Sequence, residues 1–417
     1  MNGTAERSRR SARRIIGPAE TLERFRPHMA GFGITRLSNV TGLDVVGIPV
    51  AMACRPNSRS NAVFQGKGLD LAAAKASALM EAVETACAER ILLPLKLASA
   101  ADLRREHFLV DWTGLSRPVG GAPFDEHMPI PWIEGRDLFA GGSAWVPFES
   151  VHADFTVPLP PGSGCFLAST NGLASGNNEA EALVHALCEV VERDAATLFD
   201  LRPGALEDRR VDLASIDDLE CRVLLECFAG ASLAVAVWDL TSDVGIPAFR
   251  CHVMEHADGP HLLPLPAEGQ GCHPEPDVAL CRALTEAAQG RVTAIAGVRD
   301  DIGPKFYGQP EAQETLEQWR ALVTSSGWAR PFGEISGWAS DSLEADIDAI
   351  LVRLRAVGIA QAVAIDLTPP PPFPGSVVRV VVPGLEGPRH DRYVPGHRAR
   401  ARAGQNLMPV RWLPLAS

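Results

Sequence analysis

The alternation of apolar and polar residues predicts three long helices, over residues 71–90, 179–198 and 279–297. In each window apolar residues recur at the three-to-four-residue spacing of a helix, and polar residues share one side. The first two helices collect acidic side chains on that side. The third carries Glu286, Gln289 and Arg291. Three apolar helices, each with one polar stripe, are the main feature of the chain.

Shorter alternating or β-branched segments predict strands between these helices. Two strands are expected around a turn within residues 33–52, and others over residues 62–68, 143–148, 232–240, 247–256, 361–367 and 377–382. Two more helices are expected over residues 218–229 and 342–357, whereas residues 91–160 and the basic tail from His397 are expected to be irregular. Strands and helices alternate without a regular order, so the expected class is α+β, with sheets covered by helices.

The acidic stripes on the first two helices are the residues that indicate a function. At about 100° per residue, Ser77, Glu81 and Glu84 fall in one narrow sector of their helix. On the second helix four side chains fall within roughly 80° of each other: Glu181, His185, Glu189 and Glu192. Carboxylates held together repel one another, and their pKa values rise unless hard cations neutralise them. Magnesium carrying a nucleoside triphosphate would satisfy them, so the stripes predict an ATP-using enzyme.

Taken singly, the same residues have more ordinary interpretations. A pair such as Glu81 and Glu84 is most often a solvated helix face, and a lone His185 is most often structural. The polar residues of the third helix can also form an exposed patch. The functional hypothesis therefore depends on all three stripes occurring together.

Composition and charge narrow the function classes. The 417-residue chain is 46% hydrophobic and has a formal net charge of −12, which argues against general nucleic-acid binding. Nine cysteines without a CxxC pair indicate a reduced cytoplasmic protein with structural thiols. No apolar run approaches the roughly 18 residues of a membrane span. The arginine-rich start has no apolar core after it, so it predicts a disordered arm, or less favourably a contact with an acidic partner, and no secretory signal.

The common nucleotide-binding motifs are missing. No Gly-x4-Gly-Lys-Ser/Thr pattern occurs, and no Gly-x-Gly-x-x-Gly follows a strand. For Lys67, within Gly66-Lys67-Gly68, a solvated hairpin lysine is the default, and the helix start just after it makes a phosphate contact credible.

Several segments together resemble the YcaO-domain family, in an order that covers residues 33 to 300 and extends to about 390. They are Thr41-Gly-Leu-Asp44, Gly47-Ile-Pro49, Gly66-Lys-Gly68, Ser77-x3-Glu81-x2-Glu84, Ser169-Thr-Asn-Gly172, Asn177-x3-Glu181-x7-Glu189-x2-Glu192-Arg193-Asp194, Ala283-Leu-x-Glu286-x2-Gln289-x-Arg291 and Arg299-Asp300-Asp301. The resemblance implies a YcaO-type fold with an ATP and Mg²⁺ site between helices and sheets. It also divides the chain into an arm and lead over residues 1–32, a YcaO domain over residues 33–390 and a basic tail over residues 391–417.

The resemblance further implies an enzyme that phosphorylates a peptide backbone amide oxygen with ATP. A nucleophile then attacks the carbonyl carbon and phosphate leaves. A neighbouring Cys, Ser or Thr side chain would give an azoline, and an external sulfur donor would give a thioamide. Carried over by motif, the Mg²⁺ ligands would be Glu81, Glu84, Glu181, Glu189 and Glu192. The nucleotide contacts would be Arg36, Lys67, Ser77, Asn177, Glu181, Arg193, Gln289 and Arg291. No residue is assigned a direct catalytic role.

Two features favour the thioamide-forming branch. The end of the chain lacks the Pro-x-Pro-x-Pro pattern of azoline-forming YcaO proteins. The stretch Val380-Val-Val-Pro-Gly-Leu-Glu386 with Tyr393-x-Pro395-Gly396 is similar to YcaO proteins that work beside a TfuA-type protein. The expected partners are a ribosomally made precursor peptide, a TfuA-like protein and a sulfur donor, and the sequence leaves open whether the chain forms a homodimer. An azoline-forming cyclodehydratase and a non-catalytic nucleotide-binding scaffold are the alternatives.

Overall fold

The computed structural model describes residues 14–403 apart from 160–161, 203–204, 257–262, 264–265, 300–312 and 388–392. Residues 1–13 of the expected basic arm, Asp300 and Asp301 of the family pattern, and the tail from residue 404 lie outside the described residues. The expected division into arm, domain and tail stays a prediction.

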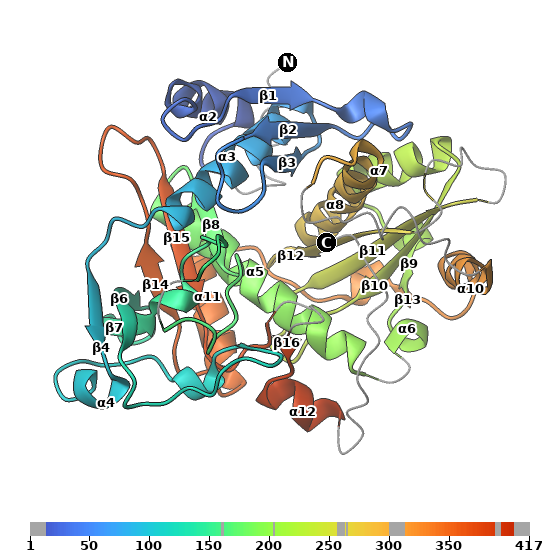
Figure 1. Ribbon diagram of the computed structural model, residues 1–417. Coiled ribbons are helices and arrows are strands. Elements are labelled where there is room, and N and C mark those ends of the chain that lie inside the picture. Colours follow the sequence, from blue (N-terminus) through green and yellow to red (C-terminus); the bar gives the residue numbers. More distant parts are fainter. Residues whose placement is uncertain are drawn as a thin grey trace.

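Three antiparallel sheets form the framework (Figure 1). The first contains β1 (Arg36–Asn39), β2 (Val50–Cys54) and β3 (Val63–Lys67), and the second β10 (Leu233–Asp239), β11 (Ala248–Glu255) and β12 (Ala267–Cys272). The third runs in the order β4 (Leu95–Ala98), β6 (Ile130–Asp137), β14 (Val363–Asp366), β15 (Ser376–Val381) and β8 (Leu173–Gly176), with β7 (Ser143–Pro147) also paired to β6. Two short ladders join β5 (Arg117–Pro118) to β16 (Tyr393–Val394) and β9 (Val211–Asp212) to β13 (Arg330–Pro331).

Three long helices lie between and against these sheets, namely α3 (Leu71–Glu89), α5 (Glu179–Asp200) and α8 (Pro276–Ala296). The helix α3 packs on β2 and β3, α8 packs on β11 and β12, and α5 packs on both β8 and β15 of the large sheet and on β12. The remaining helices are α2 (Pro18–Phe25), α4 (Ala100–Leu103), α6 (Ala205–Asp208), α7 (Leu219–Gly230), α10 (Gln313–Thr324), α11 (Leu343–Ala356) and α12 (His397–Ala403). The expected α+β class, with helices packed on sheets, is confirmed.

Glycines let α3 and α8 lie directly on their hairpins. A Cβ atom at Gly66 would lie 2.0 Å from the backbone nitrogen of Ala78, and one at Gly271 would lie 2.1 Å from the carbonyl oxygen of Ala279. Any larger residue at either position would push the helix away from the sheet. The alanines on the facing side of each helix complete this close approach.

Local pattern predicted most elements but missed those that depend on distant partners. The three long helices begin and end within a few residues of the predicted bounds. Residues 91–160 were expected to be irregular around one short strand, which is wrong, because β4 and β6 pair there and β6 also joins β14. The prediction of a loop from His397 is also wrong, because α12 forms where Ala399 is fully buried against the rest of the molecule.

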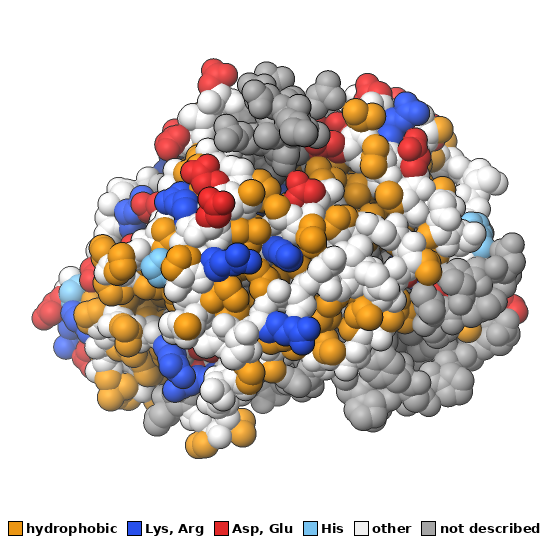
Figure 2. Space-filling view, turned by 90° about the horizontal axis from the view of Figure 1, so that it is seen from above, with side chains coloured by type: hydrophobic (Ala, Val, Ile, Leu, Met, Phe, Trp, Pro, Cys, Tyr) orange, Lys and Arg blue, Asp and Glu red, His pale blue; other side chains and the backbone are white. Residues whose placement is uncertain are grey.

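The surface carries charges of both signs. On the face seen in Figure 2, acidic and basic side chains are scattered among apolar ones, and neither sign forms a continuous area. That face therefore offers no basic patch for a nucleic acid. No helix among the described residues is long and apolar enough to cross a membrane.

Candidate functional site

A cavity of about 510 Å³ lies where α3, α5 and α8 meet, which is within the usual size of small-molecule sites. Its walls are those helices, the ends of β3, β8 and β12, and the start of the described chain. Ten of the twelve expected site residues line it: Lys67, Ser77, Glu81, Glu84, Asn177, Glu181, Glu189, Glu192, Arg193 and Gln289. The structure therefore brings together segments that are more than 200 residues apart.

The start of each long helix is fixed locally. Asp70 caps α3 by accepting a hydrogen bond from the backbone nitrogen of Ala73, and Asn178 caps α5 by accepting one from Glu181. The helix α8 begins at Pro276, a residue suited to the first helical position. Because the start of each helix is fixed, its polar stripe falls on a defined side of the helix.

The three helices also share a short sequence pattern. Each reads Ala-Leu-x-Glu-x-x followed by Glu or Gln, beginning at Ala78, Ala186 and Ala283. Before each helix, a strand glycine lies too close to the helix backbone to accept a Cβ atom: Gly66, Gly176 and Gly271. The chain thus repeats a strand-and-helix unit three times, and the equivalent polar residues of the three units face one cavity.

Burial makes the carboxylates of the cavity unusually basic. It raises the pKa of Glu81 to about 7, of Glu84 to about 8 and of Glu192 to about 7, and it also raises the pKa of Glu189. Hydrogen bonds of 2.8 and 2.6 Å from the backbone nitrogen and the hydroxyl of Ser175 offset part of this effect at Glu84. Divalent cations would favour the charged forms of all four.

The donor set fits magnesium together with phosphate. All the acidic ligands are carboxylate oxygens, which Mg²⁺ prefers. Among the described residues, however, no three cavity carboxylates bring oxygens within 4.8 Å of one another. Ions held there would need further oxygens, and Mg²⁺ usually takes them from water and from substrate phosphates.

Three buried polar atoms on the cavity wall have no hydrogen-bond partner within the described part of the chain: Gln65 Nε2, Gln270 Oε1 and His185 Nδ1. Buried polar atoms are normally paired, so these atoms suit a polar ligand. Gln65 and Gln270 occupy equivalent places, each just before the glycine that touches its helix. Sequence reasoning missed both, although the repeated Gln-Gly dipeptide was a usable signal.

Cationic side chains complete the cavity. Lys67 forms an ion pair with Glu286 across the two units. Arg282 lines the cavity and donates to the carbonyl oxygen of Cys272 at 3.0 Å. Glu286 and Arg282 were not among the expected ligands, although both belong to the polar stripe of α8.

The described start of the chain enters the cavity. The guanidinium of Arg14 lies 2.6 Å from Oε1 of Glu181, and the backbone nitrogen of Ile15 donates to Oε2 of the same carboxylate at 3.3 Å. The amide of Asn177 also donates to Glu181, at 3.1 Å. The sequence predicted a disordered arm here, or less favourably a contact with an acidic partner, whereas Arg14 pairs with a carboxylate of the cavity.

Two expected nucleotide contacts do not line the cavity. Arg36 is exposed on β1. Arg291 is fully buried on another side of α8, where its guanidinium lies 2.8 and 2.9 Å from the carboxylate of Asp44 and 3.2 Å from Glu255. The placement of Arg291 at the phosphate end is therefore corrected, because its charge is already neutralised in the core between α8 and its neighbours.

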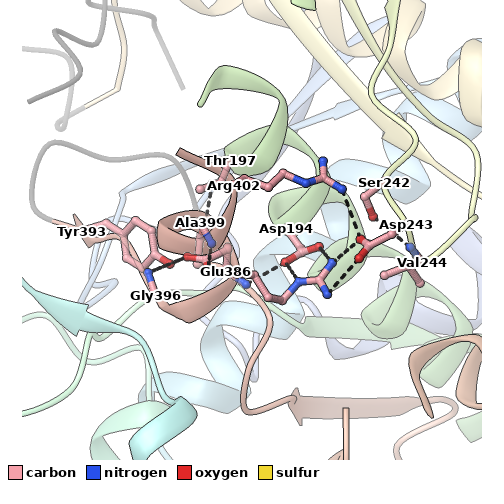
Figure 3. Close-up of polar contacts among 12 residues, drawn as sticks. Asp194, Thr197, Ser242, Asp243, Val244, Glu386, Tyr393, Gly396, Ala399 and Arg402 are labelled. Atoms are coloured by element: carbon pink, nitrogen blue, oxygen red, sulfur yellow. Dashed lines mark hydrogen bonds and ion pairs between the residues drawn. The ribbon is translucent and has the colours of Figure 1, made fainter. Parts of the chain in front are cut away.

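A buried network fastens the C-terminal segment to the far side of α5 (Figure 3). Asp194 accepts two hydrogen bonds of 3.0 Å from Arg398, which also reaches Asp243 at 2.6 Å. Glu386 accepts hydrogen bonds of 2.7 Å from the backbone nitrogens of Gly396 and Ala399. Since Asp194 directly follows Glu192 and Arg193, this network holds the cavity-lining part of α5 in place.

Comparisons with known proteins identify relatives of this chain. The family described as YcaO cyclodehydratase, ATP- and Mg²⁺-binding, matches residues 65–386. An uncharacterized protein in a tfuA 3′ region of Rhizobium leguminosarum bv. trifolii is 42% identical over 91% of this chain and 90% of its own. An uncharacterized protein of Methanothermobacter thermautotrophicus is 34% identical over 89% of this chain and 94% of its own.

Two solved structures share the fold. YcaO from Methanopyrus kandleri, bound with AMPPCP and Mg²⁺, superposes with a TM-score of 0.70 at 24% identity, over 89% of this chain and 92% of that one. A heterocyclase in complex with substrate and cofactor gives a TM-score of 0.74 at 23% identity, over 90% of this chain but only 53% of the heterocyclase. The family match, the relatives and the shared fold show that the chain belongs to the YcaO family of ATP- and Mg²⁺-binding proteins.

Proposed function

We propose that this protein modifies a backbone amide of a ribosomally synthesised precursor peptide by phosphorylating the amide oxygen with ATP. The product that we favour is a thioamide, made with a TfuA-like partner protein and a sulfur donor. The observation that carries the proposal is the convergence of acidic and amide side chains from three repeated units on one cavity.

The cavity supplies the two things that phosphoryl transfer requires, which are positioning and charge neutralisation. Bound ATP would supply the phosphoryl group that turns a poor leaving oxygen into a good one. We assign the Mg²⁺ ions to Glu81, Glu84, Glu189 and Glu192, with Glu181 available once Arg14 moves away. We assign the nucleotide to a second group of cavity residues: Lys67, Ser77, Asn177, Arg193 and Gln289.

Two observations bear on the choice of product. The relative with 42% identity is named by its place in a tfuA 3′ region, which favours thioamide formation with a TfuA-like protein. The family description includes the word cyclodehydratase, which keeps azoline formation as the second candidate. All nine cysteines are free thiols, which suits the reducing cytoplasm in which we expect the reaction to occur.

The mass of the peptide product tests the proposal. The purified protein is incubated with a precursor peptide, the TfuA-like protein, sulfide, ATP and Mg²⁺, and the peptide is analysed by mass spectrometry. Replacement of oxygen by sulfur adds about 16 Da, whereas loss of water subtracts about 18 Da. The first result supports thioamide formation and the second the azoline alternative. An unchanged peptide, with ATP binding intact, would support a non-catalytic scaffold.

A further inference from the structure

A second group of potential metal ligands lies where α7 meets α8. Asp218 caps α7 by accepting a 2.8 Å hydrogen bond from the backbone nitrogen of Cys221, so both side chains belong to one turn. Cys281 lies on α8, one turn before Thr285. Among the described residues, this is the one group of three His, Cys, Asp or Glu side chains whose ligand atoms all lie within 4.8 Å of one another.

The two sulfur atoms are close together and shielded from bulk water. The Sγ atoms of Cys221 and Cys281 lie 3.2 Å apart, and the residues are 0% and 8% exposed. In a tetrahedral site with Zn–S bonds of 2.3 Å, two thiolates lie about 3.7 Å apart, so the sulfurs would need to separate by only about half an ångström. A disulfide requires about 2.05 Å, so they would need to approach by more than 1 Å. The spacing is closer to that of a metal site.

We propose that Asp218, Cys221 and Cys281 bind a thiophilic divalent metal ion of the Zn²⁺ class. Three protein ligands leave a fourth position for water or another ligand. Cys281 also lines the cavity between α3, α5 and α8, which gives an ion a path to the group. The ion would tie the first turn of α7 to α8, the helix that carries Glu286 and Gln289.

The donor atoms distinguish this site from the magnesium site. The carboxylates of the cavity offer only oxygen, which hard ions prefer, whereas two thiolates select softer ions. The two metal sites of one chain are therefore expected to differ in selectivity, and excess Mg²⁺ should not displace a metal from the thiolate site.

Cobalt absorption provides the test, because Co²⁺ bound to thiolates absorbs in the near ultraviolet. The full-length protein, reduced and stripped with a chelator, is titrated with Co²⁺ in the presence of millimolar Mg²⁺. We expect one equivalent to give a charge-transfer band that Zn²⁺ removes. The band should be lost in Cys221→Ser and in Cys281→Ser, and kept in Cys227→Ser, which changes a thiol elsewhere on α7.

A further variant tests the carboxylate without disturbing the helix start. Asn is as good a cap as Asp, so Asp218→Asn should keep α7 folded while weakening Zn²⁺ binding at least about tenfold. The proposal is overturned if the wild type shows no band, if Mg²⁺ removes it, or if the band persists in both serine variants. Peptide mapping that finds Cys221 joined to Cys281 in the freshly purified protein would also overturn it in favour of a redox pair.

Discussion

The unit formed by β2, β3 and α3 and the unit formed by β11, β12 and α8 have the same architecture but different charges on the helix side that faces the cavity. In both, an antiparallel hairpin carries a Gln-Gly step and the following helix lies directly on its glycine. The first helix presents Ser77, Glu81 and Glu84 at the positions where the second presents Arg282, Glu286 and Gln289.

The difference lies in charge. Two carboxylates make the wall formed by α3 suitable for cations, whereas one carboxylate beside a guanidinium makes the wall formed by α8 suitable for a mixed or anionic group. Lys67, on the first unit, bridges them by pairing with Glu286 on the second. One backbone arrangement can therefore serve the metal side and the phosphate side of a site, because the side chains on the helix decide which.

Moving the second carboxylate from α3 to the equivalent position on α8 should abolish most ATP turnover. Glu84→Gln should reduce Mg²⁺-dependent ATP turnover by about 100-fold or more, because a charged ligand is lost from a desolvated site. Adding Gln289→Glu should not restore turnover, since the carboxylate would then lie on the wrong wall. Steady-state ATP hydrolysis with peptide present measures both effects.

Two controls accompany the exchange. Glu344→Gln changes an exposed helix carboxylate, and Arg36→Ala removes a guanidinium outside the cavity. Both should retain turnover within about twofold, as surface changes normally do. Recovery of activity in the double variant would mean that the two walls are interchangeable.

The third unit, β8 and α5, depends on the C-terminal segment. Arg398→Ala should lower the free energy of unfolding by about 3 kcal/mol, because it leaves the fully buried Asp194 without its guanidinium partner, while the hydrogen bond from the backbone nitrogen of Glu386 remains. Urea denaturation followed by circular dichroism measures the change. Arg402→Ala, which removes a more exposed contact at 3.7 Å, should cost less than about 1 kcal/mol. Equal effects would indicate that Arg398 acts only at the surface.

The smallest expected effect is the pH dependence of stability that comes from the carboxylates on α3. Burial raises the pKa of Glu81 to about 7 and of Glu84 to about 8 from the ordinary value of 4.5. Between pH 4.5 and the raised pKa of each group, the folded state therefore binds more protons than the unfolded state. The stabilising contribution of these two carboxyl groups to the Mg²⁺-free protein is therefore full below about pH 4.5 and is lost as the pH rises towards 8, by up to about 1.4 kcal/mol per pH unit for each group.

Thermal melts in a chelating buffer, from about pH 5 to 8, measure this loss. Glu84→Gln should flatten the profile, whereas Gln289→Glu should steepen it by adding a half-buried acid on the other wall. Addition of ATP and Mg²⁺ should raise the melting temperature most at the alkaline end, where the carboxylates are charged. A wild-type profile no steeper than that of Glu84→Gln would contradict the proposed burial of this carboxylate.

Much of the site was predictable because it depends on local periodicity. A helix of 3.6 residues per turn fixes which side chains share a side, so the stripes of α3 and α5 followed from spacing alone. The resemblance to the YcaO family, which depends on the order of its motifs, implied that ATP and Mg²⁺ bind there. The same reasoning failed for Arg291, which lies only two residues after Gln289 but projects from a different side of α8 towards Asp44.

Tertiary structure decided the rest. By itself, the sequence determined the helices, their polar stripes, the α+β class and the family. Only the folded chain placed Arg14 against Glu181, left Nε2 of Gln65 and Oε1 of Gln270 without partners among the described residues, and formed α12 around its contact with Asp194. The spacing of residues along one helix or strand decides which side chains share a side, and this can be seen in the local sequence. Burial, ion pairing and unpaired polar atoms depend instead on which distant segments of the chain come into contact.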